Sequence, residues 1–152
     1  MAVGTVSGIT PEDNWQLISS VTASGTSVTF SSLTGYKHLW ITGVGITKSV
    51  SDYVGMRPNN DSTAGDYGLG WSAGTTGTAL IASTTASAQG VSARIYNIDQ
   101  AVPHKIEGTY DSNQWSPADA YVNPVVITSL VIHCYTTASF TGGTLSLYGI
   151  PA

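Results

Sequence analysis

The sequence predicts an all-β protein, an antiparallel two-sheet β-sandwich of jelly-roll-like type. Charged residues make up only 9% of its 152 residues, against ~25% in a typical soluble domain. Thr, Val, Ile and Tyr favour strands, whereas Gly and Ser favour turns. No window carries apolar residues at helical spacing, and alternating segments recur at intervals of roughly 10–15 residues, which suits a sandwich of about eight to ten strands.

The chain divides into an N-terminal arm, residues 1–14, and a single sandwich domain, residues 15–152. The arm is small, polar and aperiodic, with the acidic pair Glu12–Asp13 near its end. Such a segment is either a disordered tail or an arm that orders when it docks on a neighbouring subunit. If it docks, its contacts are expected from Val3, Val6, Ile9 and Pro11.

The first strands are expected at residues 15–22, 27–30 and 37–47. The first two, separated by Ser-Gly, have the pattern of a hairpin. In the third, Leu and Ile point to one face while His and Trp point to the other, because strands alternate with period 2. Gly43 and Gly45 interrupt it and indicate a bulge or a close backbone approach.

The middle of the chain combines weaker strands with one very polar loop, residues 58–68. Asp61 and Asp66 crowd carboxylates into that loop. An EF-hand calcium loop needs a central Gly and a Glu at its twelfth position, which this loop lacks, so side-chain capping of turns is the favoured interpretation. Residues 111–119 are expected to form a loop, and strands are expected at residues 53–57, 67–71, 79–84, 91–98, 104–110 and 125–127.

The chain closes on residues 129–150, two alternating strands that the sequence predicts to be joined by a turn at Gly142 and Gly143. From residue 120 to the end there is no Asp, Glu, Lys or Arg. A terminal hairpin is a natural sheet edge, and bare edges pair with other chains. We therefore expect this edge to be covered by the same chain or by another copy.

Composition argues against several classes of partner. Lys and Arg number five, are scattered, and leave a net charge of -4, whereas nucleic acids and anionic membranes are bound through clustered basic residues. We expect neither partner. No segment reaches the roughly 20 apolar residues of a membrane helix, and the N-terminus lacks the features of a secretion signal, so assembly in a cytoplasm is expected.

No catalytic or metal-binding pattern stands out, and we expect neither an enzyme nor a cofactor. The three histidines lie far apart in the sequence and show no metal-ligand spacing. Asp61 and Asp66 could pair as glycoside hydrolysis requires, which keeps a small glycan hydrolase as a remote alternative. The single cysteine, Cys134, lies in an apolar strand and is expected to be buried and inert.

Four aromatic residues in or near loops are candidate contact residues: Tyr53, Trp71, Trp115 and Tyr121. Trp and Tyr anchor protein interfaces, and aromatic rings surrounded by Asn and Asp also hold sugars. Ordinary packing, a subunit interface and a glycan site are therefore all open for these four.

Three stretches resemble a widespread group of virion structural proteins from tailed bacteriophages. WQLISSVTASGTSVTFSSLTGYKHLWITG (residues 15–43) resembles the opening of that group, and RPNNDSTAGDYG (57–68) resembles its arginine–asparagine turn. FTGGTLSLYGI (140–150) is similar to its closing phrase, F-x-x-G-S-x-F-S-L-Y-G-I. The chain departs from the group at Pro58, where an aromatic is usual, and at Leu145, which replaces a common Phe.

The resemblance implies a β-sandwich component of a virion, commonly trimeric. The leading expectation is a non-enzymatic homotrimeric capsid decoration (cement) protein, located in the virion and bound to the major capsid protein. The alternative is a tail-fibre, baseplate or receptor-binding module that contacts host-surface glycan. Fold alone does not decide between these roles.

Overall fold

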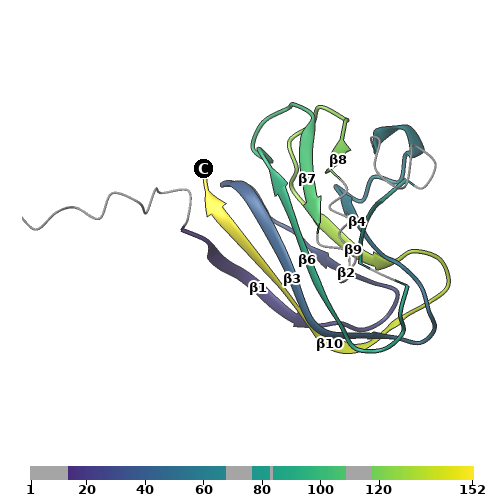
Figure 1. Cartoon of the computed structure of the whole chain (residues 1–152). Coiled ribbons are helices and arrows are strands. Elements are labelled where there is room, and N and C mark those ends of the chain that lie inside the picture. Colours follow the sequence, from purple (N-terminus) through teal and green to yellow (C-terminus); the bar gives the residue numbers. More distant parts are fainter. Residues whose placement is uncertain (1–13, 68–76, 83, 109–117) are drawn as a thin grey trace, which may run out of the picture.

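Two antiparallel sheets pack face to face in the computed structural model, which describes residues 14–67, 77–82, 84–108 and 118–152 (Figure 1). The six-stranded sheet has the spatial order β1 (Gln16–Thr22), β10 (Phe140–Pro151), β3 (Tyr36–Lys48), β6 (Gln89–Tyr96), β7 (His104–Gly108) and β8 (Ala118–Tyr121). The four-stranded sheet has the order β2 (Ser27–Phe30), β9 (Leu130–Cys134), β4 (Val54–Pro58) and β5 (Ala79–Ala82). One turn of 3-10 helix, η2 (Ala64–Asp66), lies in the polar loop.

The core fills the space between the sheets, which confirms the predicted all-β two-sheet sandwich. Leu39 and Ile41 of β3 point inward, as do Ile95 of β6 and Leu145 and Leu147 of β10, and all five are buried. Their neighbours along each strand face outward because side chains alternate with period 2. Within the described residues no helix is long and apolar enough to cross a membrane. The proposed arm, apart from Asn14, lies outside the described residues.

Both predicted hairpins are wrong, because in each case the chain crosses from one sheet to the other. β1 and β2 lie in different sheets, and so do β9 and β10. Gly142 and Gly143 lie inside β10, and the chain instead passes between the sheets at residues 135–139. The closing strands are not an edge: β9 lies between β2 and β4, and β10 lies between β1 and β3.

The glycines of β3 and β10 mark a close backbone approach, as predicted for Gly43 and Gly45. The pairing of β3 with β6 shifts register between Gly43 and Ile46. A Cβ on Gly43 would lie 2.8 Å from Ile46 Cγ1, and one on Gly143 would lie 2.5 Å from the Gly45 carbonyl oxygen. Gly143 also has a φ of +98°, a conformation that favours glycine.

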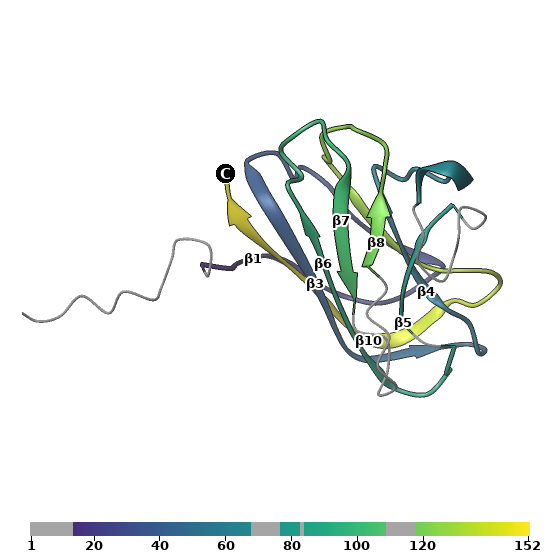
Figure 2. The ribbon, with the colours of Figure 1, turned by 45° about the horizontal axis from the view of Figure 1, so that its top comes forward.

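Strand β8 was not predicted, since residues 111–119 were expected to form a loop. Lys105 and Ile106 of β7 pair with Ala120 and Asp119 of β8. The segment ADAY has few β-branched residues, so its strand conformation comes from pairing with β7 rather than from local preference. Figure 2 shows the six-stranded sheet running from β1 and β10 to β7 and β8.

Candidate functional site

The outer face of the six-stranded sheet carries a line of side chains across five strands, which we call the outer-face row. Leu17 pairs with Tyr148, Tyr148 with Trp40, Trp40 with Arg94, and Arg94 with Glu107. Cross-strand partners lie on the same face of a sheet, and Trp40 faces away from the buried Leu39. The pairing therefore assembles one surface from residues that are far apart in the sequence.

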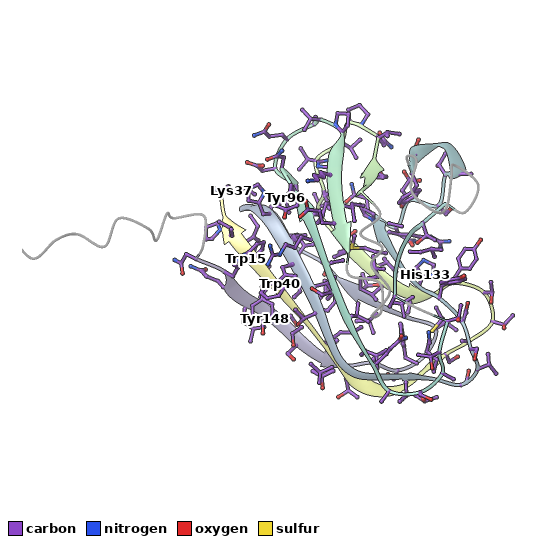
Figure 3. All side chains as sticks on the ribbon, in the orientation of Figure 1. Trp15, Lys37, Trp40, Tyr96, His133 and Tyr148 are labelled. Carbon is purple, nitrogen blue, oxygen red and sulfur yellow. The ribbon has the colours of Figure 1, made fainter. Side chains whose placement is uncertain are left out.

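Arg94 and three aromatic rings hold each other in place at the centre of this face. The Arg94 guanidinium lies 5.0 Å from the Trp40 ring centroid and 5.8 Å from that of Trp15. Trp40 contacts Trp15 edge-on at 5.8 Å and Tyr148 at 5.6 Å, and Figure 3 shows these three rings on one side of the molecule, far from His133. The Trp40 Nε1–H donates to Ser92 Oγ at 2.9 Å. Cation–π and ring contacts of this kind each contribute about 0.5–1.5 kcal/mol, so the rings form an ordered surface.

The charged groups of the face gather at its β6–β7 side. The Tyr96 hydroxyl donates to Glu107 Oε2 at 2.7 Å, and Lys105 forms an ion pair with Glu107. The hydrogen bonds from Lys105 and Tyr96 lower the pKa of Glu107. Burial, followed by the bond to Glu107, raises the pKa of Tyr96. His38 contacts the Tyr96 ring at 5.3 Å.

The β1–β10–β3 side of the same face, extended by Ser92 of β6, carries hydroxyl groups and no charge. Ser20 pairs with Ser146, which pairs with Thr42, and Thr42 pairs with Ser92; we call these four residues the hydroxyl patch. Ser20 and Ser146 share a hydrogen bond of 2.9 Å. Solvated sheet faces usually carry charge, whereas the cores of protein interfaces are depleted in charge and enriched in Trp, Tyr and Arg. The outer face therefore has the composition of a contact surface.

Tyr121, a predicted contact residue, belongs instead to a polar network under the loop of η2. Its side chain is 1% exposed, and its hydroxyl donates to Asp61 Oδ2 at 2.8 Å. The Tyr67 hydroxyl donates to the Asp61 carbonyl oxygen at 2.6 Å. Asn123 Nδ2 bridges Asp61 and Asp66 at 3.4 and 3.1 Å. We call these five residues the aspartate cluster. Of the alternatives left open for Tyr121, the structure agrees with ordinary packing, because its ring is buried and its hydroxyl bonds to Asp61.

The pKa values of the two carboxyls of this cluster are shifted in opposite directions. Burial alone would raise the pKa of Asp61, but hydrogen bonds from Thr63 and Tyr121 outweigh it and lower that pKa. The hydrogen bond with Asp61, followed by burial, raises the pKa of Asp66. Asp61 Oδ1 also accepts the Thr63 backbone N–H at 2.8 Å, which is the turn capping that the sequence predicted. The cluster thus fastens the loop against β8.

Of the remaining candidates, the structure describes only Tyr53. Tyr53 is half-buried and contacts Tyr135 edge-on at 6.3 Å. Trp71 and Trp115 lie outside the described residues, and so do Val3, Val6, Ile9 and Pro11. Of the four aromatic candidates, the structure describes only Tyr53 and Tyr121, and these two have different partners: Tyr135 for Tyr53, and Asp61 for Tyr121.

His104 and His133 lie in separate places, and His133 adjoins Cys134, with its Nδ1 2.8 Å from the Cys134 carbonyl oxygen. His104 Nε2 lies 2.7 Å from the Val125 carbonyl oxygen, and His133 Nε2 lies 2.8 Å from Thr78 Oγ1. Burial lowers the pKa of His133. Burial also raises the pKa of the Cys134 thiol to about 11, which confirms a buried thiol that stays protonated near neutral pH. In the part of the chain that the structure describes, no group of three or more His, Cys, Asp or Glu residues could hold a metal ion.

Sequence reasoning missed the outer-face row as a site. Alternation did place Trp40 and Arg94 on the faces opposite to their apolar neighbours. The sequence did not show which strands lie next to each other. No known protein family matches the chain, and comparisons with curated proteins and with solved structures found no match either. The outer face is therefore identified by geometry and composition.

Proposed function

We propose that this chain is a non-enzymatic structural protein of a tailed-phage virion, a homotrimeric decoration (cement) protein with a jelly-roll sandwich that binds the major capsid protein. The outer face of the six-stranded sheet carries this proposal. It combines an ordered Trp–Arg–Tyr centre with an uncharged flank, and interfaces concentrate their binding energy in such residues. The resemblance of the closing phrase to phage virion proteins supports the same role.

Several copies of the outer face on one trimer would compensate for the modest size of each contact with the shell. Four neighbouring strands about 4.8 Å apart and about seven residues long cover roughly 450 Å². A standard interface buries about 800 Å² on each partner. Three such faces on one trimer would add effective concentration, and an extended arm of about 14 residues would reach roughly 45 Å to further contacts.

Binding to shells tests the proposal. Heads of the encoding phage, prepared without this protein, would be sedimented with the parent and with a Trp40→Ala, Tyr148→Ala variant. We expect the variant to need at least about tenfold more protein for half-occupancy, since hot-spot truncations cost more than about 2 kcal/mol. Val50→Ala, an exposed apolar residue outside the six-stranded sheet, is the matched control and should bind like the parent. Full occupancy by the double variant would refute this contact.

A receptor-binding module that contacts glycan is the second candidate. Half-buried Trp15, Trp40 and Tyr148 beside the hydroxyl patch favour it, because sugars stack on rings and bond to polar groups around them. Glycan-array signal that disappears in Trp15→Ala, together with no binding to shells, would select this role over decoration.

A further inference from the structure

β1 is an unprotected edge of the six-stranded sheet. Its only strand neighbour among the described residues is β10. Its sequence, QLISSVT, contains no charged residue and no proline, which are the usual devices that keep edge strands from pairing with other chains. The uncharged stretch extends from Trp15 to Tyr36, so the neighbouring chain segments supply no charge either.

Apolar side chains along β1 are incompletely covered. Ile18 and Val21 pack against the core but are only half-buried. By contrast, the inward Leu145 and Leu147 of the adjacent interior strand β10 are fully buried, so the incompletely covered surface is that of Ile18 and Val21. A further strand beside β1 would bury this surface and pair the free backbone groups.

The opposite edge of the same sheet is covered within the chain. Tyr67 forms a bridge with Tyr121 of β8. The Val122 N–H donates to the Asp66 carbonyl oxygen at 2.8 Å. The loop of η2 thus lies along β8, so among the described residues β1 is the edge of this sheet that has no such cover.

A register shift between Leu17 and Ser19 limits the pairing surface to the second half of β1. Bulges protect edges locally, but residues 19–22 pair regularly with β10 beyond it. These four residues are Ser, Ser, Val and Thr, and none would repel an identical strand.

We infer that β1 pairs antiparallel with β1 of a second copy around a two-fold axis perpendicular to the sheet, with Ser20 opposite Ser20. Such an axis keeps the outer faces of both copies on the same side, so their outer-face rows would join into one surface. The inference rests on the proposed function only in that copies of the chain must meet on the virion. The two-fold contact would join two single copies or two neighbouring trimers.

The pairing is expected to be weak in isolation. With Ser20 on the axis, Ser19 faces Val21 of the other copy, so only about three residues of each strand pair regularly. Such a contact buries less than the ~1,200 Å² of a stable interface, and identical contacts repeated on an assembly would strengthen it. Self-association of the purified chain is therefore expected at high concentration.

A single cysteine tests the geometry. Paired residues in antiparallel strands have Cα atoms about 4.5–5.5 Å apart, within the range of a disulfide, and the native Cys134 is buried. Ser20→Cys should therefore yield a covalent dimer on oxidation. Thr144→Cys, exposed on the same face but on the interior strand β10, is the control and should stay monomeric on a non-reducing gel.

A charge tests the contact in solution. Sedimentation velocity should show that Ser20→Lys raises the concentration for half-association at least about tenfold, whereas Thr144→Lys leaves it unchanged. Equal effects of both lysines would mean that faces rather than edges meet, and a parent monomeric at about 1 mM, or Ser20→Cys without a dimer, would also overturn the inference. Shell binding by the parent is scored separately, so a parent that stays monomeric while occupying shells in full refutes the edge contact and leaves the proposed function standing.

Discussion

The two ends of the six-stranded sheet are built in opposite ways. At the β7–β8 end, Lys105, Glu107 and the aspartate cluster supply charge and hydrogen bonds, and the loop of η2 covers the edge. At the β1 end, hydroxyl groups and half-buried aliphatic residues line an open edge, and glycines let β10 and β3 approach closely. A polar network stabilises the β7–β8 end, and close backbone packing stabilises the β1 end. The uncharged β1 end is therefore the one suited to contact with another chain.

Gly143→Ala should have the largest effect on stability, because it disrupts the close backbone packing of β10 against β3 at the β1 end. The new Cβ would lie 2.5 Å from the Gly45 oxygen at a φ of +98°. We expect a loss of about 3 kcal/mol or more in the free energy of unfolding, measured by urea denaturation. Gly25→Ala has a φ of +70° but open space around its Cβ, and should cost only about 1 kcal/mol.

Asp61→Ala should be nearly as damaging at the other end. It leaves the Tyr121 hydroxyl and the Thr63 N–H without their acceptor, and a buried unsatisfied group costs about 1–3 kcal/mol. We expect a loss of about 2–3 kcal/mol with faster hydrogen exchange at Val122. Asp99→Ala, on an exposed turn, is the control; an Asp61→Ala protein as stable as the parent would show that the network does not fasten β8.

Arg94→Ala should weaken the outer-face row by about 1 kcal/mol, because it removes contacts with Trp15 and Trp40. Arg94→Lys keeps the charge but not the planar stacking, so its melting temperature should fall between those of the parent and Arg94→Ala. Equal melting temperatures for the parent and both variants would show that the contacts of Arg94 in the outer-face row do not stabilise the fold.

The pH dependence of stability should distinguish the two carboxyls. The lowered pKa of Asp61 contributes stability above about pH 4 that is lost as the pH falls through its folded pKa. The raised pKa of Asp66 acts the other way: its contribution is present below about pH 4 and is lost as the pH rises through the folded pKa. Asp66→Asn should therefore abolish the loss of stability on raising the pH that Asp66 causes. Thermal melts from pH 3 to 7 measure this loss. An unchanged profile would show that the hydrogen bond with Asp61 does not raise the pKa of Asp66.

Lys105→Ala should have the smallest effect. The ion pair with Glu107 is exposed at both side chains, and such pairs contribute about 0–1 kcal/mol. A shift within about 0.5 kcal/mol is expected, and it should shrink further in 0.5 M salt because exposed pairs are screened.

Part of the outer face could be predicted from sequence, because facing direction is a local property. Alternation placed Trp40 opposite to Leu39 and Ile41, and Arg94 opposite to Ala93 and Ile95. It did not reveal that Trp40 lies between Tyr148 and Arg94, since that depends on which strands pair. The alternatives for Tyr121 stayed open for the same reason: its acceptor, Asp61, is distant in the sequence.

The sequence by itself determined the all-β sandwich, the glycine-marked irregularity in β3 and the lack of charge along β1 and β10. These follow from composition and period 2, which act between near neighbours in the chain. The assignment of β1 and β2, and of β9 and β10, to different sheets became known from the structure, as did the position of β1, rather than the C-terminal strands, at an edge among the described residues. Strand order is set by long-range packing of the two inner faces, and the same alternating pattern satisfies a hairpin or a crossing between sheets equally well.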